Sequence, residues 1–488
     1  MALIDRFQLE VIPHWHQSFV TSGSLVKTHT VGSLTETYYP AKYWPGDTLG
    51  GQLEFALKYD GTNLAILAAI FQAAPRKELE DHITSKLRGK YVRRLWFLYE
   101  MLTGMRLDID DLRTGGYIDL LEPSMYYTVS PPIPVRRQRV NDNLPGDRRF
   151  CPIVRRTVAL EKFEATDLSQ RCREIAAAYS PPLLKRAMGY LYTKETRSSF
   201  AMENLEPTST RTERFVSLLQ AAKSGDYCEK PRLLELQNQI VDPRFRDSDY
   251  RNTQNYVGER VSWQQEKIHC VFPRPEDLPE LMEGWMAAHR RISQSDLRDI
   301  PAIVHAAMMS YGFVFLHPFE DGNGRIHRFL IHHILARRDF TPEGMIFPVS
   351  ASMLKNRGDY EATLEAFSRP LMELVEYHLD EEGRMTVQNE TACWYRYPDL
   401  TFQTEKLFRF IEQTLETELV PELAFLANYD RIKKAIQEII DMPDSKIDLF
   451  IRVCHQNGGK LSKNKRESLF GFLSDQEIAR MEEAVNAR

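Results

Sequence analysis

The residues best suited to chemistry stand close together in residues 317–328, which read HPFEDGNGRIHR. His317 titrates near neutral pH, so it is a candidate general base. Asp321 offers a hard carboxylate oxygen of the kind that Mg²⁺ prefers. Arg325 and Arg328 are three residues apart, so on a helix they share a face and both can bind phosphate through their planar forks. Together these residues predict a site that holds a nucleotide polyphosphate and activates a hydroxyl beside it.

The glycines in this stretch predict how the phosphates are held. Gly322, Asn323 and Gly324 come directly before a helical pattern. Glycine permits positive φ and lets a ligand approach the backbone. Successive N–H groups in such a turn form an anion site, to which the helix N-terminus adds its own donors. A GNG turn by itself is an ordinary helix-to-helix connection, and only the nearby base, carboxylate and arginines favour a phosphate cradle.

Two predicted helices must position these residues. Asp299 followed by Pro301 is a helix-start signal, and the pattern that follows runs toward His317. A second helix is predicted after the glycines. The apolar faces of the two helices consist of Ile303, Val304, Ala307, Met308 and Tyr311, and of Ile326, Phe329, Leu330, His333 and Ile334.

Composition narrows the class of protein. Of the 488 residues 43% are hydrophobic and 27% charged, which is typical of a soluble globular protein. The net charge of −5 gives no global basic field, so nucleic acid is not expected as the main partner. The first residues lack the pattern of a signal peptide, and no apolar stretch is long enough to span a membrane. We therefore expect a cytoplasmic protein with no membrane contact.

The six cysteines carry little information in the sequence. They are widely scattered and form no CxxC pair, so the sequence suggests neither a zinc site nor a disulfide scaffold. Reduced thiols are the expected state in a cytoplasm.

The chain divides into three predicted regions. Residues 1–165 form a mixed, mostly helical region of unknown role, residues 166–384 hold the candidate site, and residues 385–488 are helical. The last region ends with Ser474 and Glu477, a capping-box pattern. This region can be a helix-turn-helix-like module, or a bundle for dimerisation or target docking, and the sequence does not choose between them.

The stretch 317–328 resembles the signature HPFx(D/E)GNGRxxR of Fic-domain proteins at every specified position. The resemblance extends over about residues 185–380. It implies a mainly α fold, with a Fic-type helical core and a small β-hairpin flap, to which the N-terminal and C-terminal helical regions are added. It also implies a protein adenylyltransferase, which transfers AMP from ATP to a Ser, Thr or Tyr hydroxyl of a protein and needs Mg²⁺.

The same resemblance implies a role for each residue of the motif. His317 deprotonates the incoming hydroxyl, and Asp321 holds Mg²⁺ on the α- and β-phosphates. The backbone of residues 322–324 cradles phosphate. Arg325 supports the leaving pyrophosphate, and Arg328 anchors the γ-phosphate.

A second motif lies upstream of the first. Ser199 and Glu203 match the inhibitory pattern (S/T)xxxE(G/N) of the same family, and we expect an inhibitory helix over about residues 196–206. On a helix the two residues share a face. By the resemblance Glu203 pairs with Arg328 and takes the place meant for the γ-phosphate, which predicts self-inhibition. An ordinary exposed glutamate near a helix end is the alternative reading.

The remaining expected site residues lie on either side of the motif. Residues 250–275 resemble the flap, with Glu259–Lys267 as an apparent insertion, and a protein substrate is expected to dock along this hairpin as an added strand. Val257 and Gly258 are expected to border the nucleotide. Tyr360 resembles the residue that contacts the nucleoside.

Two other functions stay open at this stage. In one, the chain removes AMP from a modified protein, and Glu203 orients a water molecule. In the other, the Fic-like part is a non-catalytic regulatory or binding scaffold, although the intact His317 and Asp321 argue against it. Self-modification and homodimer formation are also left open.

Overall fold

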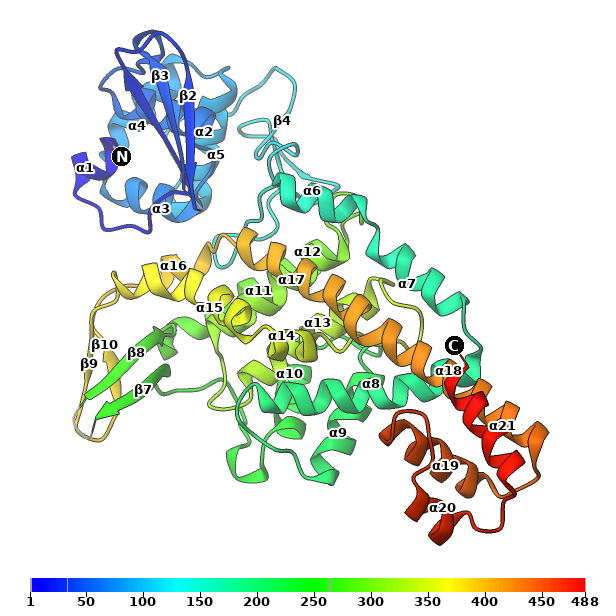
Figure 1. Cartoon of the computed structure of the whole chain (residues 1–488). Helices are drawn as coiled ribbons and strands as arrows, with labels where there is room; N and C mark the ends of the chain where they lie inside the picture. The colour runs from blue at the N-terminus through cyan, green and yellow to red at the C-terminus, as the bar shows by residue number, and fades with distance from the viewer. Residues whose placement is uncertain (1, 33, 263–264, 488) are drawn as a thin grey trace.

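The fold is mainly α-helical, as predicted (Figure 1). The computed structural model describes residues 2–32, 34–262 and 265–487. The N-terminal region lies at one end of a central helical core, and the last helices lie at the other end. Within these residues, no helix has both the length and the apolar composition needed to cross a membrane.

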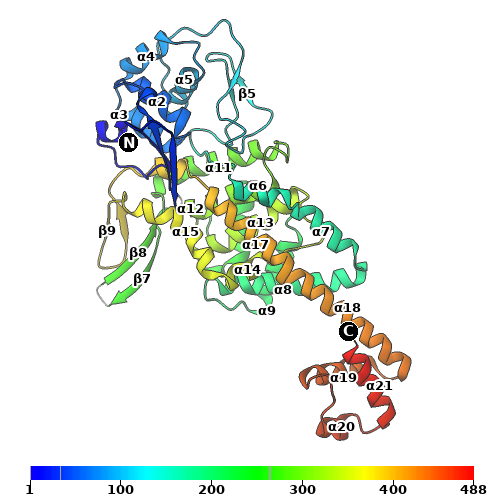
Figure 2. The same cartoon turned by 45° about the horizontal axis from the view of Figure 1, so that its top comes forward.

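The N-terminal region combines helices with two small sheets. In the first sheet β3 lies between β1, to which it is parallel, and β2, to which it is antiparallel. In the second, β6 lies between β4 and β5. Figure 2 shows the helices of this region grouped beside the first sheet. The elements are α1 (Ala2–Phe7), β1 (His16–Thr21), β2 (Lys27–Val31), β3 (Leu34–Pro40), α2 (Leu49–Tyr59), α3 (Leu64–Ala73), α4 (Arg76–Ser85), α5 (Lys90–Thr103), β4 (Ile118–Asp119), β5 (Ile133–Val135) and β6 (Val140–Asp142).

The central core is a set of helices packed around α12. Every residue of α12 is buried, because α11, α13 and α17 pack against it from several directions. The sequence predicted a one-sided apolar stripe here, but a helix that is apolar all round belongs in the middle of a core. The helices are α6 (Val158–Ala165), α7 (Leu168–Ala177), α8 (Pro181–Ala201), α9 (Ser209–Gln220), α10 (Lys230–Ile240), α11 (Leu278–Ser293), α12 (Ala302–Leu316), α13 (Asn323–Arg337), α14 (Val349–Lys355), α15 (Arg357–Met372), α16 (Ala392–Arg396) and α17 (Thr401–Thr414).

Two β-hairpins lie at the edge of this core (Figure 1). The predicted flap is present as β7 (Tyr256–Ser262) paired antiparallel with β8 (Gln265–Val271). The apparent insertion in the flap lengthens both strands, because its residues continue the ladder. The second hairpin, β9 (Tyr377–Leu379) with β10 (Met385–Val387), was not predicted. The hydroxyl of Tyr256 donates to the carbonyl of Gly383 over 3.3 Å, which joins the two hairpins.

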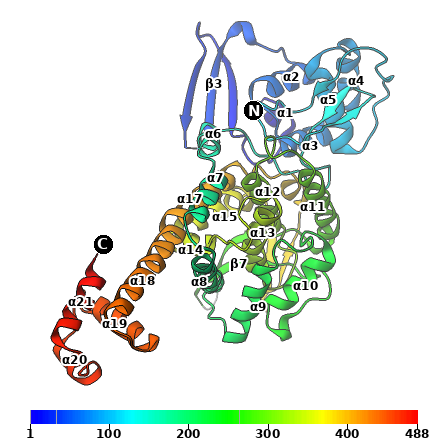
Figure 3. The same cartoon turned by 90° about the vertical axis from the view of Figure 1, so that its right-hand side faces the viewer.

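The C-terminal helices form a second hydrophobic core. α18 (Val420–Ile439) projects away from the central core, and α19 (Asp444–Gln456), α20 (Lys463–Leu469) and α21 (Asp475–Asn486) gather along it (Figure 3). The predicted capping box at Ser474 and Glu477 is confirmed, with both reciprocal hydrogen bonds present.

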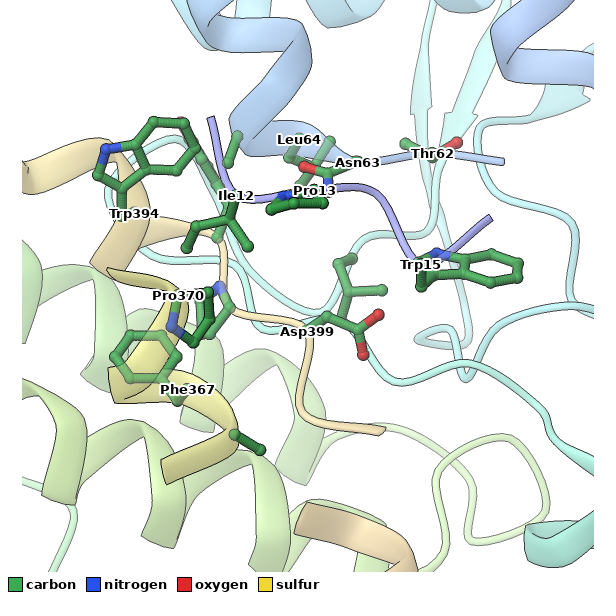
Figure 4. Close-up of a pocket in the computed structure, with 15 residues that line it drawn as sticks. Ile12, Pro13, Trp15, Thr62, Asn63, Leu64, Phe367, Pro370, Trp394 and Asp399 are labelled. Carbon is green, nitrogen blue, oxygen red and sulfur yellow. The ribbon is translucent and has the colours of Figure 1, made fainter. Parts of the chain in front are cut away.

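A cavity of about 160 Å³ lies between the N-terminal region and the central core. Figure 4 shows Ile12 and Pro13 of the N-terminal segment facing Phe367 and Pro370 of α15, with Trp394 beside them. None of the residues that line this cavity belongs to the predicted phosphate site, so the cavity is a feature of the contact between the two regions.

Candidate active site

The loop between α12 and α13, together with the first turn of α13, carries the predicted motif, and we call residues 317–324 the histidine–glycine loop. His317 ends α12 with a φ of 50°, and Gly322 begins the next helix with a φ of 90°. The buried amide of Asn323 donates to the carbonyl of Phe319 (2.7 Å) and accepts from its N–H (3.1 Å). Asn323 therefore fixes the loop through its side chain, a role that the sequence did not predict.

His317 is held in one orientation. Its Nδ1 lies 3.2 Å from the carbonyl of Val314, so Nδ1 is the nitrogen that donates and Nε2 keeps a free lone pair. The ring stacks on Phe272 at 3.7 Å between centroids. Loss of hydration lowers the pKa of His317 to about 3, the Val314 contact partly opposes this, and the charge of Arg251 adds to it. His317 is therefore neutral at physiological pH, the state in which it can accept a proton.

Arg251 joins the start of the flap to His317, which the sequence did not predict. It is 4% exposed and donates to the carbonyls of His317 (2.8 Å), Thr253 (2.7 Å) and Pro273 (2.6 Å). Its own N–H donates to the carbonyl of Pro318. A sequence motif cannot identify such a residue, because all of the hydrogen-bond partners of the Arg251 side chain are backbone carbonyls.

Replacing Arg251 with methionine is expected to lower the free energy of unfolding by about 3 kcal/mol, because one buried and two partly buried hydrogen bonds from a charged donor are lost. Arg244→Met is the matched control, since that side chain is 80% exposed and its loss should cost less than about 0.5 kcal/mol. Urea unfolding followed by circular dichroism measures both. Equal shifts for the two variants would contradict a positioning role for Arg251.

Glu203 reaches into the site from the end of α8. Its Oε1 lies 2.7 Å from Nη2 of Arg328, and its Oε2 lies 2.7 Å from Nε of Arg325. Both arginines are buried, whereas the Glu203 side chain is 27% exposed. A Cβ on Gly324 would stand 2.6 Å from Oε1 of Glu203, so only glycine leaves room for this carboxylate. Glu203 thus occupies the turn that was predicted to cradle phosphate.

The segment that was expected to be inhibitory differs from the predicted helix 196–206. α8 begins earlier, at Pro181, and ends at Ala201. The N–H groups of Asn204 and Leu205 bond to the carbonyls of Ala201 and Phe200, and Asn204 has a φ of 56°. This pattern is a Schellman motif, which needs a residue that tolerates the left-handed region after the last turn. The asparagine that follows Glu203 in the motif therefore closes the end of the helix, and Glu203 lies in the turn directly after Ala201.

Ser199 supports the same arginine. Its Oγ accepts from Nε of Arg328 (2.8 Å), and its carbonyl accepts from Nη2 (2.6 Å). Tyr360 is 5% exposed and also lies against Arg328, whose charge partly offsets the rise that burial causes in the pKa of Tyr360. The structure therefore brings Ser199, Glu203 and Tyr360 together around Arg328.

Asp321 lies at the mouth of the site. Its Oδ1 accepts from the N–H of Gly322 (2.6 Å) and from Nη2 of Arg325 (2.7 Å). Its side chain is 44% exposed. Both contacts fall on one oxygen, so the carboxylate still has a second oxygen to offer a metal ion. A single half-exposed carboxylate fits Mg²⁺, which keeps several waters and bridges phosphate oxygens.

The residues just before the first flap strand form hydrogen bonds with the histidine–glycine loop. Thr253 Oγ1 donates to Glu320, and the amide of Asn255 donates to the carbonyl of Phe319 (3.4 Å). Val257 is 47% exposed on β7, and Gly258 lies at a bulge in the ladder. Val257 and Gly258, which were expected to border the nucleotide, therefore come directly after Thr253 and Asn255 in the chain, the residues that bond the flap to the loop.

Comparison with known proteins agrees with the motif. The model of the Fic/DOC family matches residues 227–335, which include the flap and α11 to most of α13. The protein adenylyltransferase Fic of Culex quinquefasciatus is 34% identical over 124 residues, which cover 24% of this chain and 21% of that protein. The protein of the same name from Nematostella vectensis is 37% identical over 93 residues, 19% of each chain.

The chain thus spans about a fifth of the length of these curated relatives. A solved Fic family protein from Desulfovibrio desulfuricans G20 aligns with 66% of this chain and 86% of its own, at 19% identity and a TM-score of 0.37.

Proposed function

We propose that this chain is a Fic-type protein adenylyltransferase that its own Glu203 inhibits. The match of the Fic/DOC family model to residues 227–335 supports the proposal. The observation that carries the proposal is the arrangement around the histidine–glycine loop. A neutral His317 with a free Nε2 stands at one end of the loop, and a helix N-terminus with two buried arginines stands at the other. A proton acceptor beside an anion site is what nucleotidyl transfer to a hydroxyl requires.

The reaction transfers AMP from ATP to a Ser, Thr or Tyr hydroxyl of a protein. The hydroxyl oxygen attacks the α-phosphorus while its proton moves to Nε2 of His317. The bond from the α-phosphorus to the bridging oxygen of the β-phosphate breaks, and pyrophosphate leaves. Asp321 would hold Mg²⁺, which would supply charge neutralisation at the phosphate oxygens.

The phosphates of ATP are assigned to the α13 end of the loop. The N–H groups of residues 322–324 donate to phosphate oxygens, and the helix dipole favours their negative charge. Arg325 stabilises the pyrophosphate that leaves, and Arg328 binds the γ-phosphate. Most of the rate then comes from positioning and charge stabilisation.

Inhibition follows from competition for the same arginines. Glu203 makes ion pairs of 2.7 Å with both Arg325 and Arg328, and Ser199 holds Arg328 in the same orientation. A γ-phosphate cannot bind Arg328 while that carboxylate is in place. ATP bound beside an engaged Glu203 is therefore displaced from the pose that aligns its α-phosphorus with His317.

The protein substrate is assigned to the flap. A two-stranded hairpin offers a strand edge to an extended peptide, and main-chain pairing sets the peptide in register with the loop. Arg251, Thr253 and Asn255 connect the flap to the loop, so a peptide on the flap is positioned relative to His317. Val257, Gly258 and Tyr360 are proposed to complete the nucleotide pocket.

Labelling with two forms of ATP tests the reaction. The Glu203→Gly variant is incubated with a cell lysate and with ATP carrying ³²P in either the α- or the γ-position. We expect labelled protein only from the α-form, and mass spectrometry should find AMP on a Ser, Thr or Tyr side chain. Label from the γ-form would indicate phosphorylation instead. Release of AMP by wild type from a target labelled in this way would favour the hydrolytic alternative.

A further inference from the structure

A cluster of metal-binding side chains lies away from the histidine–glycine loop. The ligand atoms of Asp226, Cys228 and His333 all lie within 4.8 Å of one another. His333 is in the second half of α13, ten residues after Asn323, and this places it about 15 Å along the helix from the loop. Cys228 and His333 are fully buried. The cluster is therefore separate from the proposed active site.

His289 on α11 lies beside these three residues and is the candidate fourth donor, although it is outside the group whose ligand atoms all lie within 4.8 Å of one another. Its Nε2 lies 3.2 Å from Oδ2 of Asp226, and the residue is 2% exposed. The cluster thus combines one carboxylate, one thiol and two imidazoles. These donors come from three parts of the chain. Asp226 and Cys228 lie in the segment before α10, His289 lies on α11, and His333 lies on α13.

Each histidine already has a partner for the ring nitrogen that faces away from Asp226. Nδ1 of His333 lies 2.7 Å from the carbonyl of Ala222, so this nitrogen carries the proton and Nε2 keeps a lone pair. Nδ1 of His289 lies 3.2 Å from Nε2 of His305, which is itself buried. Metal-binding histidines in proteins are oriented in this way, by a hydrogen bond from the nitrogen that does not bind the metal.

We propose that Asp226, Cys228, His289 and His333 bind one Zn²⁺ ion in a closed, four-coordinate structural site. Zinc prefers thiolate and imidazole donors, whereas Mg²⁺ and Ca²⁺ prefer oxygen. A thiolate and a carboxylate together balance the two positive charges of the ion, so the filled site is neutral and suits a buried position.

Binding of Zn²⁺ would change which atoms of the cluster carry protons. The thiol of Cys228 loses its proton to solvent, and the sulfur bonds to the metal. His289 keeps one proton, which sits on Nδ1 and is donated to Nε2 of His305. His305 then carries its own proton on Nδ1, a buried atom with no hydrogen-bond partner among the described residues. Several present contacts must yield. The N–H of Tyr227 lies 3.2 Å from Nε2 of His333, and Nη2 of Arg337 lies 3.9 Å from Asp226. Nε2 of His289 lies 3.3 Å from Oγ of Ser293 and 3.2 Å from Asp226, and the metal would replace both contacts.

The filled site would join three elements of the core. The segment 225–228 would be bound to α11 and to α13, the helix whose first turn carries the phosphate donors. Zinc would therefore stabilise the packing of α13 from its far end, without contact with ATP.

Cobalt substitution in the full-length chain tests the site. The protein is stripped with a chelator, desalted and loaded with Co²⁺ or Zn²⁺, and bound metal is measured by mass spectrometry. We expect one tightly bound ion per chain and, with Co²⁺, a thiolate-to-cobalt charge-transfer band with tetrahedral d–d bands. Co²⁺ at an all-oxygen site such as Asp321 gives no thiolate band, so the two sites are distinguished.

Variants assign the ligands. Cys228→Ser should abolish the charge-transfer band, and His333→Gln should abolish tight binding. Cys172→Ser, which changes another fully buried cysteine on α7, should leave both unchanged. The proposal is overturned if wild type that has been loaded with metal retains none after excess metal is removed by desalting. It is also overturned if the Cys228→Ser protein keeps the wild-type cobalt spectrum. The first outcome depends on no variant, so a misfolded mutant does not affect it.

Discussion

Replacing Glu203 with glycine is expected to raise the rate of AMP incorporation by about 10- to 100-fold. The carboxylate holds Arg325 and Arg328 at 2.7 Å each and stands over Gly324. A charge-assisted hydrogen bond is worth about 1.5–3 kcal/mol, and each 1.4 kcal/mol that favours the competent state is a factor of ten. The measurement is initial labelling from α-³²P ATP at equal concentrations of wild type and variant.

Glu206→Gly is the matched control for this experiment. Glu206 is exposed, lies three residues further along and undergoes the same change of residue type. It should label at the wild-type rate. If Glu203→Gly and Glu206→Gly label alike, Glu203 does not restrain the enzyme. A second measurement, ATP binding by calorimetry, should show a change in the affinity for ATP only in Glu203→Gly.

Removing the base in the activated background should have the largest effect. His317→Ala, introduced into Glu203→Gly, is expected to lower labelling by about 10²- to 10⁴-fold, the usual contribution of a positioned general base. Because the pKa of His317 lies well below neutrality, the parent histidine is fully available to accept a proton at pH 7.

The binding of ATP provides the control for His317→Ala. The phosphate donors lie at the other end of the loop, on residues 322–324 and α13. The double variant should therefore bind ATP with about the affinity of Glu203→Gly, within a factor of a few. Loss of binding together with labelling would indicate a collapsed loop, and unchanged labelling would remove His317 from the mechanism.

The motif could be predicted from sequence because its residues are local. His317, Asp321 and the two arginines lie within twelve positions, so helix periodicity and glycine conformation already place them on one loop and one helix face. The spacing of Ser199 and Glu203 was informative for the same reason. The contact of Glu203 with Arg325 as well as Arg328 was missed, since it depends on how α8 packs against α13.

Features made by distant segments could not be predicted in this way. Arg251 binds backbone carbonyls, which have no sequence signature. Cys228 is far from any other cysteine in sequence, so cysteine spacing did not suggest a metal site, yet folding places it beside Asp226 and His333. The short strands of β9 and β10 offer too few residues for a clear alternating pattern.

The mainly α fold could be predicted as a class, whereas the regions around the helical core could be predicted less well. The resemblance implied the helical core and the flap, and the structure has both. α12 is buried on every side because it lies between other helices, and periodicity alone cannot distinguish this from a one-sided helix.

The charges around Gly324 have a consequence for how a nucleotide enters. Arg325 and Arg328 are balanced by Glu203 and Asp321, so the resting site is neutral rather than positive. On the proposed function, nucleotide binding would be an exchange of counter-ions, in which the triphosphate replaces a carboxylate that is attached to the chain. α8 would fix the effective concentration of that internal anion, and the external anion would compete with it at every turnover.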